Sequence, residues 1–430
     1  MKKILLILLC LPMIGFGQNV NIPDANFKAY LVGNTAINTN GDTEIQVSEA
    51  NAFPGNIDCN SMNISDLTGI EAFTALTSLE CQVNNISTID VSNNLALTDF
   101  VCSQNQLTSL DVSGATNLTY LRCIDNQLTS LNVSANTALT FLQCRINQLD
   151  SLDLSQNTSL NNLDCSQNQL TSLDVSTHLA LTSLSCSFNQ LDSLNVSQNT
   201  ALIQLNCSFN QLNSINVRQN TALTFFSCTN NQIDSLDLSQ NLALTQLSCG
   251  ENQLTSLNVS THLALTSLSC SGNQLDSLDL SQNNSLTYLY CNRNQLDSLD
   301  VSNNPALITL NCWNNQLDSL DLSQNLALTQ LSCGENQLTS LNVSTHLALT
   351  SLSCWGNQLT SLDVRNGNNT NFTVFYSTNN PDLYCIDVDA AAWSTTNWTD
   401  IDPQHYFSNN CSGTTSIQEH TTNKELLKVT

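Results

Sequence analysis

Apolar residues recur along the chain at a constant spacing of 21 residues. A cysteine marks each repeat, with a leucine five residues before it and an asparagine three residues after it. The cysteines of this series are Cys81, Cys102, Cys123, Cys144, Cys165, Cys186, Cys207, Cys228, Cys249, Cys270, Cys291, Cys312, Cys333 and Cys354. In the repeat around Cys270, Leu268 and Cys270 alternate with polar residues, which puts both side chains on one face of a short strand.

Each repeat also contains a second apolar pair, such as Leu278 and Leu280, which predicts another extended segment on the opposite side of a coil. A coil then has about six inward side chains, at roughly 2 kcal/mol each. These cannot offset an ordering cost of about 1–2 kcal/mol for each residue of the coil. Stacking must therefore supply shared core, and we predict a β-rich solenoid of about 14–15 coils.

The unit Leu265-x-x-Leu268-x-Cys270-x-x-Asn273-x-Leu275 resembles the leucine-rich repeat over roughly residues 60–365. Its 21-residue length is similar to that of bacterial surface proteins of the internalin-like type, including those exported by Bacteroidetes. The resemblance implies a right-handed superhelix with a parallel β-sheet on its concave face. It also implies that the repeated asparagine bonds backbone groups at the turn after the strand, so that these asparagines are architecture and not a binding site.

The repeated cysteines occupy positions that hold leucine in the family, so we expect buried free thiols there. Neighbouring cysteines in a stack would have parallel side chains, which is a poor geometry for disulfides. Cys385 and Cys411 lie outside the repeat and are predicted to form a disulfide in the C-terminal cap. His178, His262 and His346 are 84 residues apart, too far to share a metal ion, and each takes a position that holds asparagine in other coils.

The chain has 10 Lys+Arg against 35 Asp+Glu and a formal net charge of −25. This balance argues against nucleic acid and anionic membranes as partners, since both require basic patches. Ser and Asp recur only at template positions, and no nucleophile elbow, phosphate loop or paired-histidine motif is present. We therefore predict a binding protein and not an enzyme, with no cofactor apart from the calcium considered below.

The strand half of the repeat varies from coil to coil, whereas the second half hardly changes. Aromatic and arginine side chains gather at its outward positions, in clusters near 120–145 and 288–313. Such side chains suit protein hot spots and sugar stacking, and we predict that they bind a protein or glycan ligand on the concave face. The alternative is that they only cover neighbouring coils. The predicted ligand residues are Tyr120, Arg122, Phe141, Arg145, Phe225, Tyr288, Tyr290, Arg293, Trp313 and Trp355.

A second hypothesis for the function is a structural or adhesin element that self-associates through its uniform polar faces. Nearly verbatim copies favour it, since residues 234–270 and 318–354 are identical. The polar faces also carry the triplet Asp-Ser-Leu, which resembles the acceptor motif for O-glycosylation in Bacteroidetes, although Asp and Ser are also plain outward template residues. The candidate acceptors are Ser151, Ser193, Ser235, Ser277, Ser298 and Ser319.

Residues 18–58 are predicted to cap the first coil, with a helix over 23–31 that Asp24 can cap. The following segment resembles an EF-hand loop through Asn38, Asn40, Asp42, Glu44 and Glu49, which would be calcium ligands. It departs from that pattern at Asn38 and at Thr43, where an acid and glycine are expected. Calcium binding and a plain cap with a polar turn both remain open.

The chain begins like a secretory signal peptide over residues 1–17, with two lysines, an apolar run and small residues before Gln18. The repeats are assigned to 59–365, a C-terminal cap to 366–412, and a linker with a terminal segment to 413–430. The terminal segment resembles the opening of the C-terminal sorting domain of type IX secretion substrates. We predict a secreted or cell-surface protein without a transmembrane segment.

Overall fold

The computed structural model describes residues 18–413, and both the predicted leader and the sorting-like segment beyond residue 413 lie outside this range. The chain divides into two compact units, Met1–Ala180 and Leu181–Thr430. No helix among the described residues has the length and apolar character needed to cross a bilayer.

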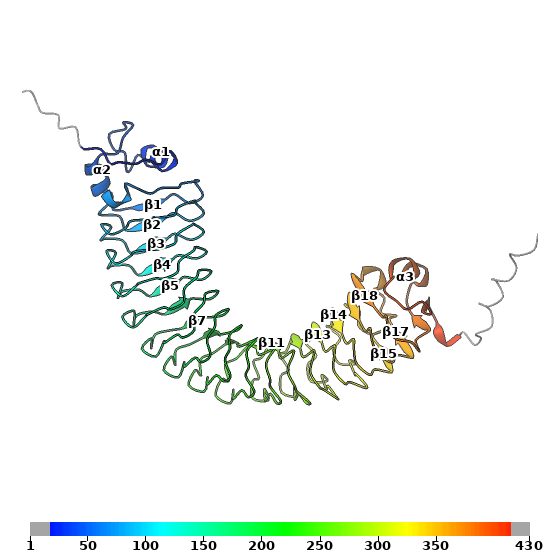
Figure 1. Ribbon diagram of the computed structural model, residues 1–430. Coiled ribbons are helices and arrows are strands. Elements are labelled where there is room, and N and C mark those ends of the chain that lie inside the picture. Colours follow the sequence, from blue (N-terminus) through cyan, green and yellow to red (C-terminus); the bar gives the residue numbers. More distant parts are fainter. Residues whose placement is uncertain (1–17, 414–430) are drawn as a thin grey trace, which may run out of the picture. The chain divides into compact units, whose positions relative to one another are not determined.

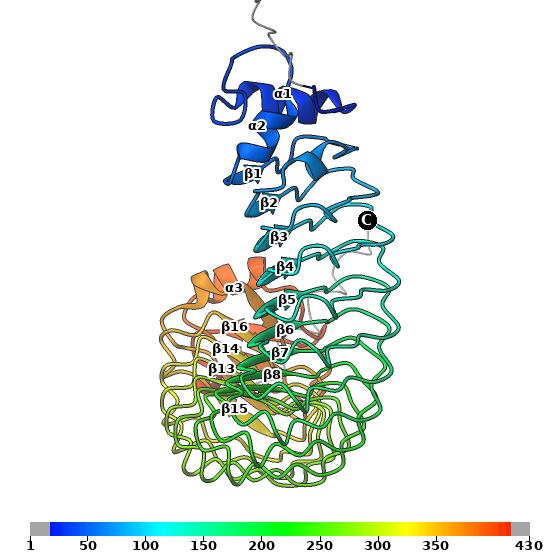
Figure 2. The ribbon, with the colours of Figure 1, turned by 90° about the vertical axis from the view of Figure 1, so that its left-hand side faces the viewer.

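The first unit begins with two short helices and continues as a stack of parallel strands (Figures 1 and 2). Asp24 caps the first helix, accepting hydrogen bonds from the backbone N–H groups of Asn26 and Phe27 at 2.9 Å, as the sequence predicts. The elements are α1 Ala25–Gly33, α2 Val47–Ala52, β1 Asn56–Asp58, η1 Ile70–Ala72, β2 Ser78–Glu80, β3 Asp99–Val101, β4 Tyr120–Arg122, β5 Phe141–Gln143 and β6 Asn162–Asp164.

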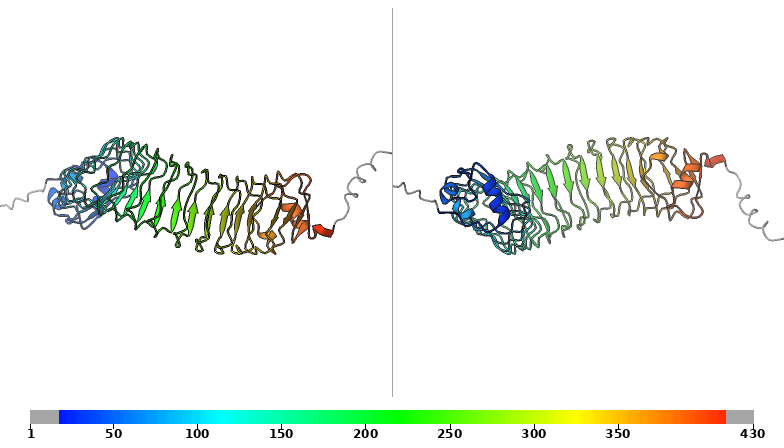
Figure 3. Two further views of the ribbon diagram at one scale, coloured as in Figure 1. Left: turned by 90° about the horizontal axis from the view of Figure 1, so that it is seen from below. Right: turned by 90° about the horizontal axis from the view of Figure 1, so that it is seen from above.

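The second unit continues with strands of the same kind, which Figure 3 shows as parallel arrows side by side. Each strand is three residues long, and its middle residue pairs with the middle residue of the next strand. The strands are β7 Ser183–Ser185, β8 Gln204–Asn206, β9 Phe225–Ser227, β10 Gln246–Ser248, β11 Ser267–Ser269, β12 Tyr288–Tyr290, β13 Thr309–Asn311, β14 Gln330–Ser332, β16 Ser351–Ser353 and β18 Val374–Tyr376.

The second extended segment of the coil forms a regular sheet only near the C-terminal cap. There β15 Ser340–Asn342, β17 Ser361–Asp363, β19 Cys385–Asp387 and β20 Tyr406–Ser408 pair in parallel. In the first unit the same segment makes isolated bridges such as Asp90 to Asp111. The remaining elements are η2 Asn369–Asn371, α3 Ala391–Asn397 and η3 Cys411–Gly413.

The predicted leucine-rich-repeat solenoid is confirmed, but the array runs to about 17 turns and not 14–15. The additional coils lie in segments that the sequence assigns to the caps. Strand β1 precedes Cys59, which is 22 residues before Cys81, and β18 replaces the cysteine column with Ser377. Both coils keep the inward apolar residue, Ile57 and Phe375, while losing the spacing by which a repeat is recognised.

The inward residues form a continuous core. In the coil of Cys270 all six predicted positions are buried, including both leucines of the second segment. The amide of the repeated asparagine then joins two coils. The Nδ2 of Asn210 donates to the carbonyl oxygens of Cys207 (3.1 Å) and of Cys186 in the preceding coil (3.0 Å), and its Oδ1 accepts from Leu191 N–H (3.0 Å). The architectural role predicted for this residue is confirmed.

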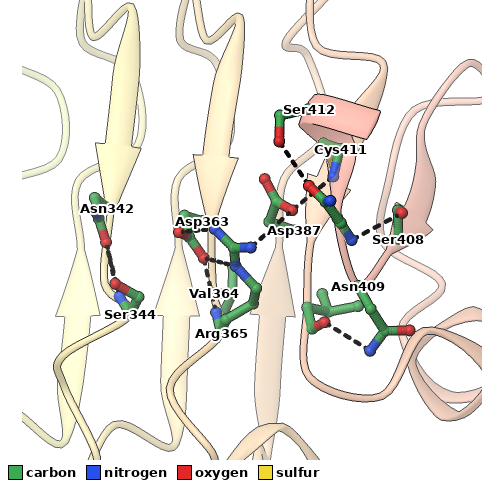
Figure 4. A network of polar contacts seen from close by, with 12 residues as sticks. Asn342, Ser344, Asp363, Val364, Arg365, Asp387, Ser408, Asn409, Cys411 and Ser412 are labelled. Atoms are coloured by element: carbon green, nitrogen blue, oxygen red, sulfur yellow. Dashed lines mark hydrogen bonds and ion pairs between the residues drawn. The ribbon is translucent and has the colours of Figure 1, made fainter. Parts of the chain in front are cut away.

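The C-terminal cap is held by aromatic packing and by a polar network (Figure 4). Trp398 stacks on Phe375 with ring centroids 4.0 Å apart, which covers the last inward residue of the strand sheet. On the second sheet, Arg365 pairs with Asp363 at 2.7 Å and with Asp387 at 3.6 Å. Cys385 and Cys411 form a disulfide, the pair that the sequence singles out.

Replacing Asn210 with alanine is expected to lower the free energy of unfolding by about 2–5 kcal/mol, because it leaves buried backbone donors and acceptors without partners. Urea denaturation followed by circular dichroism measures this loss. The matched control is Gln211→Ala, at the exposed position next in sequence. Equal destabilisation by both substitutions would contradict the coil-joining role.

Candidate binding face

The outward residues of the parallel strands form the surface that we call the strand face. It comprises the first and third residue of each strand and the two residues after the repeated cysteine. The middle residue of each strand is buried, as the pattern exposed–buried–intermediate of β12 shows. The second residue after the cysteine adopts a left-handed backbone in nearly every coil, for example Phe188 with φ 54°. The chain therefore turns sharply there and projects that side chain outward.

The first predicted cluster is assembled in the structure. Tyr120 of β4 and Phe141 of β5 are register partners, and their rings stack with centroids 4.3 Å apart at 9°. The guanidinium carbon of Arg122 lies 5.5 Å from the Tyr120 ring centroid and 5.7 Å from that of Phe141. The stacked pair thus restrains one cationic side chain by cation–π attraction. The Nε of Arg122 is buried and has no hydrogen-bond partner among the described residues.

The other arginines of residues 18–413 are engaged with carboxylates. Arg145 lies 3.8 Å from Asp164, and Arg218 lies 3.0 Å from Asp237. Arg293 pairs with Glu251 at 2.8 Å, although two coils separate them. Glu251 crosses the intervening coil at Gly272, where a Cβ atom would lie 2.5 Å from its carboxylate. Arg145 and Arg293 therefore have partners within the chain, unlike Arg122.

The second predicted cluster is looser. Tyr288 and Tyr290 both point outward from β12, and Tyr288 is 42% exposed. Trp313 follows β13 and is half-buried. Trp355 occupies the equivalent position two coils later and lies against Gly334, where a Cβ atom would be 2.6 Å from its Nε1. Trp355 thus covers a neighbouring coil, as the alternative interpretation of the aromatics expects.

A further aromatic pair lies outside both predicted clusters. Phe188 and Phe209 stack with centroids 4.1 Å apart at 8°, and they are 48% and 38% exposed. They occupy the same template position in consecutive coils, 21 residues apart, which is the signal that would have identified a pair. Phe225, which the sequence does select, is half-buried at the start of β9.

The EF-hand-like loop satisfies most of its own polar groups. Glu49 accepts hydrogen bonds from the backbone N–H groups of Thr39, Asn40 and Gln46. Burial opposes ionisation of Glu49, but these bonds outweigh it and hold its pKa below the usual value. Glu44 pairs with Lys28 at 2.7 Å.

The amide of Asn38 donates to Val32 O and to Asp42 O, while Asn40 and Asp42 bond each other and Gln46. Within residues 18–413 no three His, Cys, Asp or Glu side chains are grouped so that they could hold a metal ion. These contacts favour the plain polar turn over calcium binding, and calcium at this loop stays an untested prediction.

The six candidate acceptor serines are all exposed, on the segment opposite the strands. Each hydroxyl donates to the carboxylate of the preceding aspartate, for example Ser151 to Asp150 at 2.8 Å and Ser319 to Asp318 at 2.7 Å. Accessibility therefore permits modification, and the glycosylation itself stays a prediction.

The cysteines and histidines are part of the core. Every cysteine of the repeat is buried and free, as predicted, and Cys59 continues the column. Burial raises the pKa of the Cys207 thiol to about 12, so it stays protonated at neutral pH. His346 is buried, and its Nε2 lies 3.2 Å from Leu322 O, the type of bond that Asn325 makes to Val301 O at 2.9 Å.

No protein-family model matches the chain. Among solved structures, the functional domain of InlJ from Listeria monocytogenes, which includes a cysteine ladder, is 38% identical with a TM-score of 0.77. The match covers 86% of this chain and 82% of that one. Among curated proteins, Internalin J of Listeria monocytogenes serotype 4b (strain F2365) is 41% identical over 72 residues. That segment is 17% of this chain and spans only 8% of the length of Internalin J.

More distant structures share the fold alone. The leucine-rich-repeat protein LIC12759 of Leptospira interrogans has a TM-score of 0.68 at 23% identity, covering 84% of this chain and 97% of that one. The plant peptide hormone receptor RGFR1 in complex with RGF2 has a TM-score of 0.66 at 20% identity, covering 82% and 66%.

Thiol labelling tests the core position of the cysteines. With iodoacetamide we expect almost no labelling of the folded chain, and labelling of all 15 cysteines from Cys59 to Cys354 after denaturation without reductant. Intact mass spectrometry counts the adducts. Widespread disulfides in the column, seen as a large deficit of adducts in the denatured chain, would contradict the packing.

A pH dependence follows from His346. Burial lowers its pKa, so the unfolded chain binds the proton first as the pH falls. Its contribution to stability is therefore complete above the ordinary histidine pKa and is lost as the pH falls through the folded-state value. The variant His346→Asn, which has the residue usual at this position, should lose less unfolding free energy between about pH 7.5 and about pH 5. Equal losses in chemical denaturation of the two proteins would contradict this assignment.

Proposed function

The chain belongs to the internalin-like leucine-rich-repeat proteins, and we propose that it binds a protein ligand through its strand face. Kinship with the InlJ domain supports a binding role. The receptor–peptide complex among its structural relatives is an example of this fold receiving a peptide. Binding through outward side chains also needs no change in the repeated core.

Arg122 is the observation that carries the proposal. The chain has 35 acidic residues, and the other arginines of its described part each have a carboxylate within 4 Å. Arg122 lies instead against two stacked rings, where its conformational freedom is already reduced. A restrained guanidinium loses little further entropy on binding, and its planar fork matches a carboxylate. We infer that an acidic group of the ligand binds Arg122 while apolar groups contact Tyr120 and Phe141.

Tyr288, Tyr290 and Trp313 provide a second contact area of the same character in the other unit. Tyrosine and tryptophan side chains dominate the energetics of protein interfaces because they bury much area with few rotatable bonds. The leader-like segment 1–17 and the internalin-like kinship support an exported protein at the cell surface or in the medium. A glycan ligand and the type IX secretion machinery remain hypotheses from the sequence resemblance.

The alternative hypothesis, an element that associates with its own copies, is favoured by one observation. Residues 234–270 and 318–354 are identical, so their surfaces repeat as well. Self-association and ligand binding use different side chains and can coexist.

The proposal predicts that Tyr288→Ala, Tyr290→Ala and Trp313→Ala together abolish retention of the protein ligand, while the midpoint of thermal unfolding changes little. Arg122→Lys keeps the charge but loses the planar fork, and it should weaken binding about tenfold or more. The assay captures proteins from a cell-surface extract on the immobilised full chain and quantifies them by mass spectrometry.

The matched control is Tyr384→Ala, which removes a tyrosine that is 59% exposed but lies next to β19, away from the strand face. Retention that survives both the triple variant and Arg122→Lys would refute a ligand site on the strand face.

A further inference from the structure

A column of exposed leucines runs along one turn of the second unit. The position follows the buried asparagine or histidine of the turn that leads into each strand. It holds Leu242, Leu263, Leu326 and Leu347, which are 56%, 62%, 53% and 71% exposed. The turn itself does not require leucine, because Thr200, Thr221 and Asn284 occupy the same position in other coils and are exposed. These leucines therefore contribute surface and not core.

The four leucines form two pairs in consecutive coils. The coils of Leu242 and Leu263 are joined just beyond the turn by the bond from Thr266 N–H to Thr245 O at 2.8 Å. The coils of Leu326 and Leu347 have the equivalent bond from Thr350 N–H to Thr329 O at 2.9 Å. Stacked coils are about 4.8 Å apart, so each pair forms one continuous apolar patch. An exposed alanine follows each leucine and widens the patch, at Ala243, Ala264, Ala327 and Ala348.

The surroundings of the patches have no formal charge, in a chain whose net charge is −25. The turn segments 239–245, 260–266, 323–329 and 344–350 contain no Asp, Glu, Lys or Arg. Two acidic chains repel each other wherever their carboxylates approach. This turn is a surface that two copies can bring together without placing like charges opposite one another.

The order of residues along the column is self-complementary. It reads two leucines, then Asn284 and Pro305, then two leucines, and it is the same in both directions. A two-fold axis between Asn284 and Pro305 would place Leu242 opposite Leu347 of a second copy, and Leu263 opposite Leu326. A closed dimer requires such a patch, in which one surface complements itself.

We propose that the chain forms a two-fold, antiparallel homodimer through this leucine ridge, which comprises Leu242, Leu263, Leu326 and Leu347 with their adjacent alanines. Burying neighbouring leucines against those of a second copy supplies apolar contact along the middle of the interface. The ridge lies on a turn and not on the strand face. The dimer therefore presents two strand faces, and a ligand with two epitopes is bound with avidity.

Sedimentation velocity of the full chain over a range of concentrations tests the dimer. We expect a shift from monomer to dimer with rising concentration, and a loss of about tenfold or more in dimer affinity for the variant Leu263→Asn with Leu326→Asn. Asparagine occurs naturally at this position in Asn284, so the substitution is compatible with the turn. The matched control, Thr200→Asn with Thr221→Asn, changes the same position in coils outside the ridge and should dimerise normally.

Cross-linking with a short bismaleimide tests the orientation, since the cysteines of the column are buried and protected. A mixture of Leu242→Cys chains and Leu347→Cys chains should give the mixed cross-linked dimer, whereas Leu242→Cys alone should give little product. A chain that stays monomeric, a dimer that survives the leucine substitutions, or efficient cross-linking of Leu242→Cys to itself would each overturn the proposal.

Discussion

The hydrogen bonds of one repeated asparagine side chain are the interaction on which the rest of the structure depends. A three-residue strand followed by a left-handed residue leaves backbone groups buried where the chain turns away. In Asn210 and its equivalents, a single amide bonds carbonyl groups of its own coil and of the coil before it, and accepts an N–H group of that earlier coil. The same residue therefore closes a turn and joins two coils, and stacking removes the cost that one coil cannot meet alone.

This division of labour explains where the chain can vary. The inward leucines, cysteines and asparagines are fixed by packing and by hydrogen bonds, and the histidines His262 and His346 occupy the asparagine position while making the equivalent bond to a carbonyl group. Outward positions carry no such constraint. Aromatic, basic and aliphatic side chains can accumulate there without any change in the fold, which is how a uniform scaffold acquires distinct surfaces for a ligand and for a second copy.

The sequence predicts the scaffold well because its signal is periodic. The buried cysteines, the role of the asparagine and the cap on α1 all follow from spacing and residue type. The prediction fails at the ends, where β1 and β18 keep the inward residue but lose the 21-residue spacing. At the binding face it selects residues such as Tyr120 and Arg122 but cannot say which are free. That Arg293 reaches Glu251 two coils away, and that Arg122 has no such partner, depends on side-chain conformations that no spacing encodes. The loop at Asn38 is similar, since its pattern of oxygens fits calcium while its contacts are made with its own backbone.

The central claim is that architecture and binding reside in different side chains of the same repeat. Its most direct test is a chain whose outward residues on β4, β5 and β12 are all replaced by serine, the residue that β7 and β11 carry at the same positions. Hydrogen–deuterium exchange and ligand retention are measured on this chain together. The account predicts unchanged protection of the strand amides together with complete loss of the ligand. Ligand binding that persists with the strand face reduced to serine would contradict it.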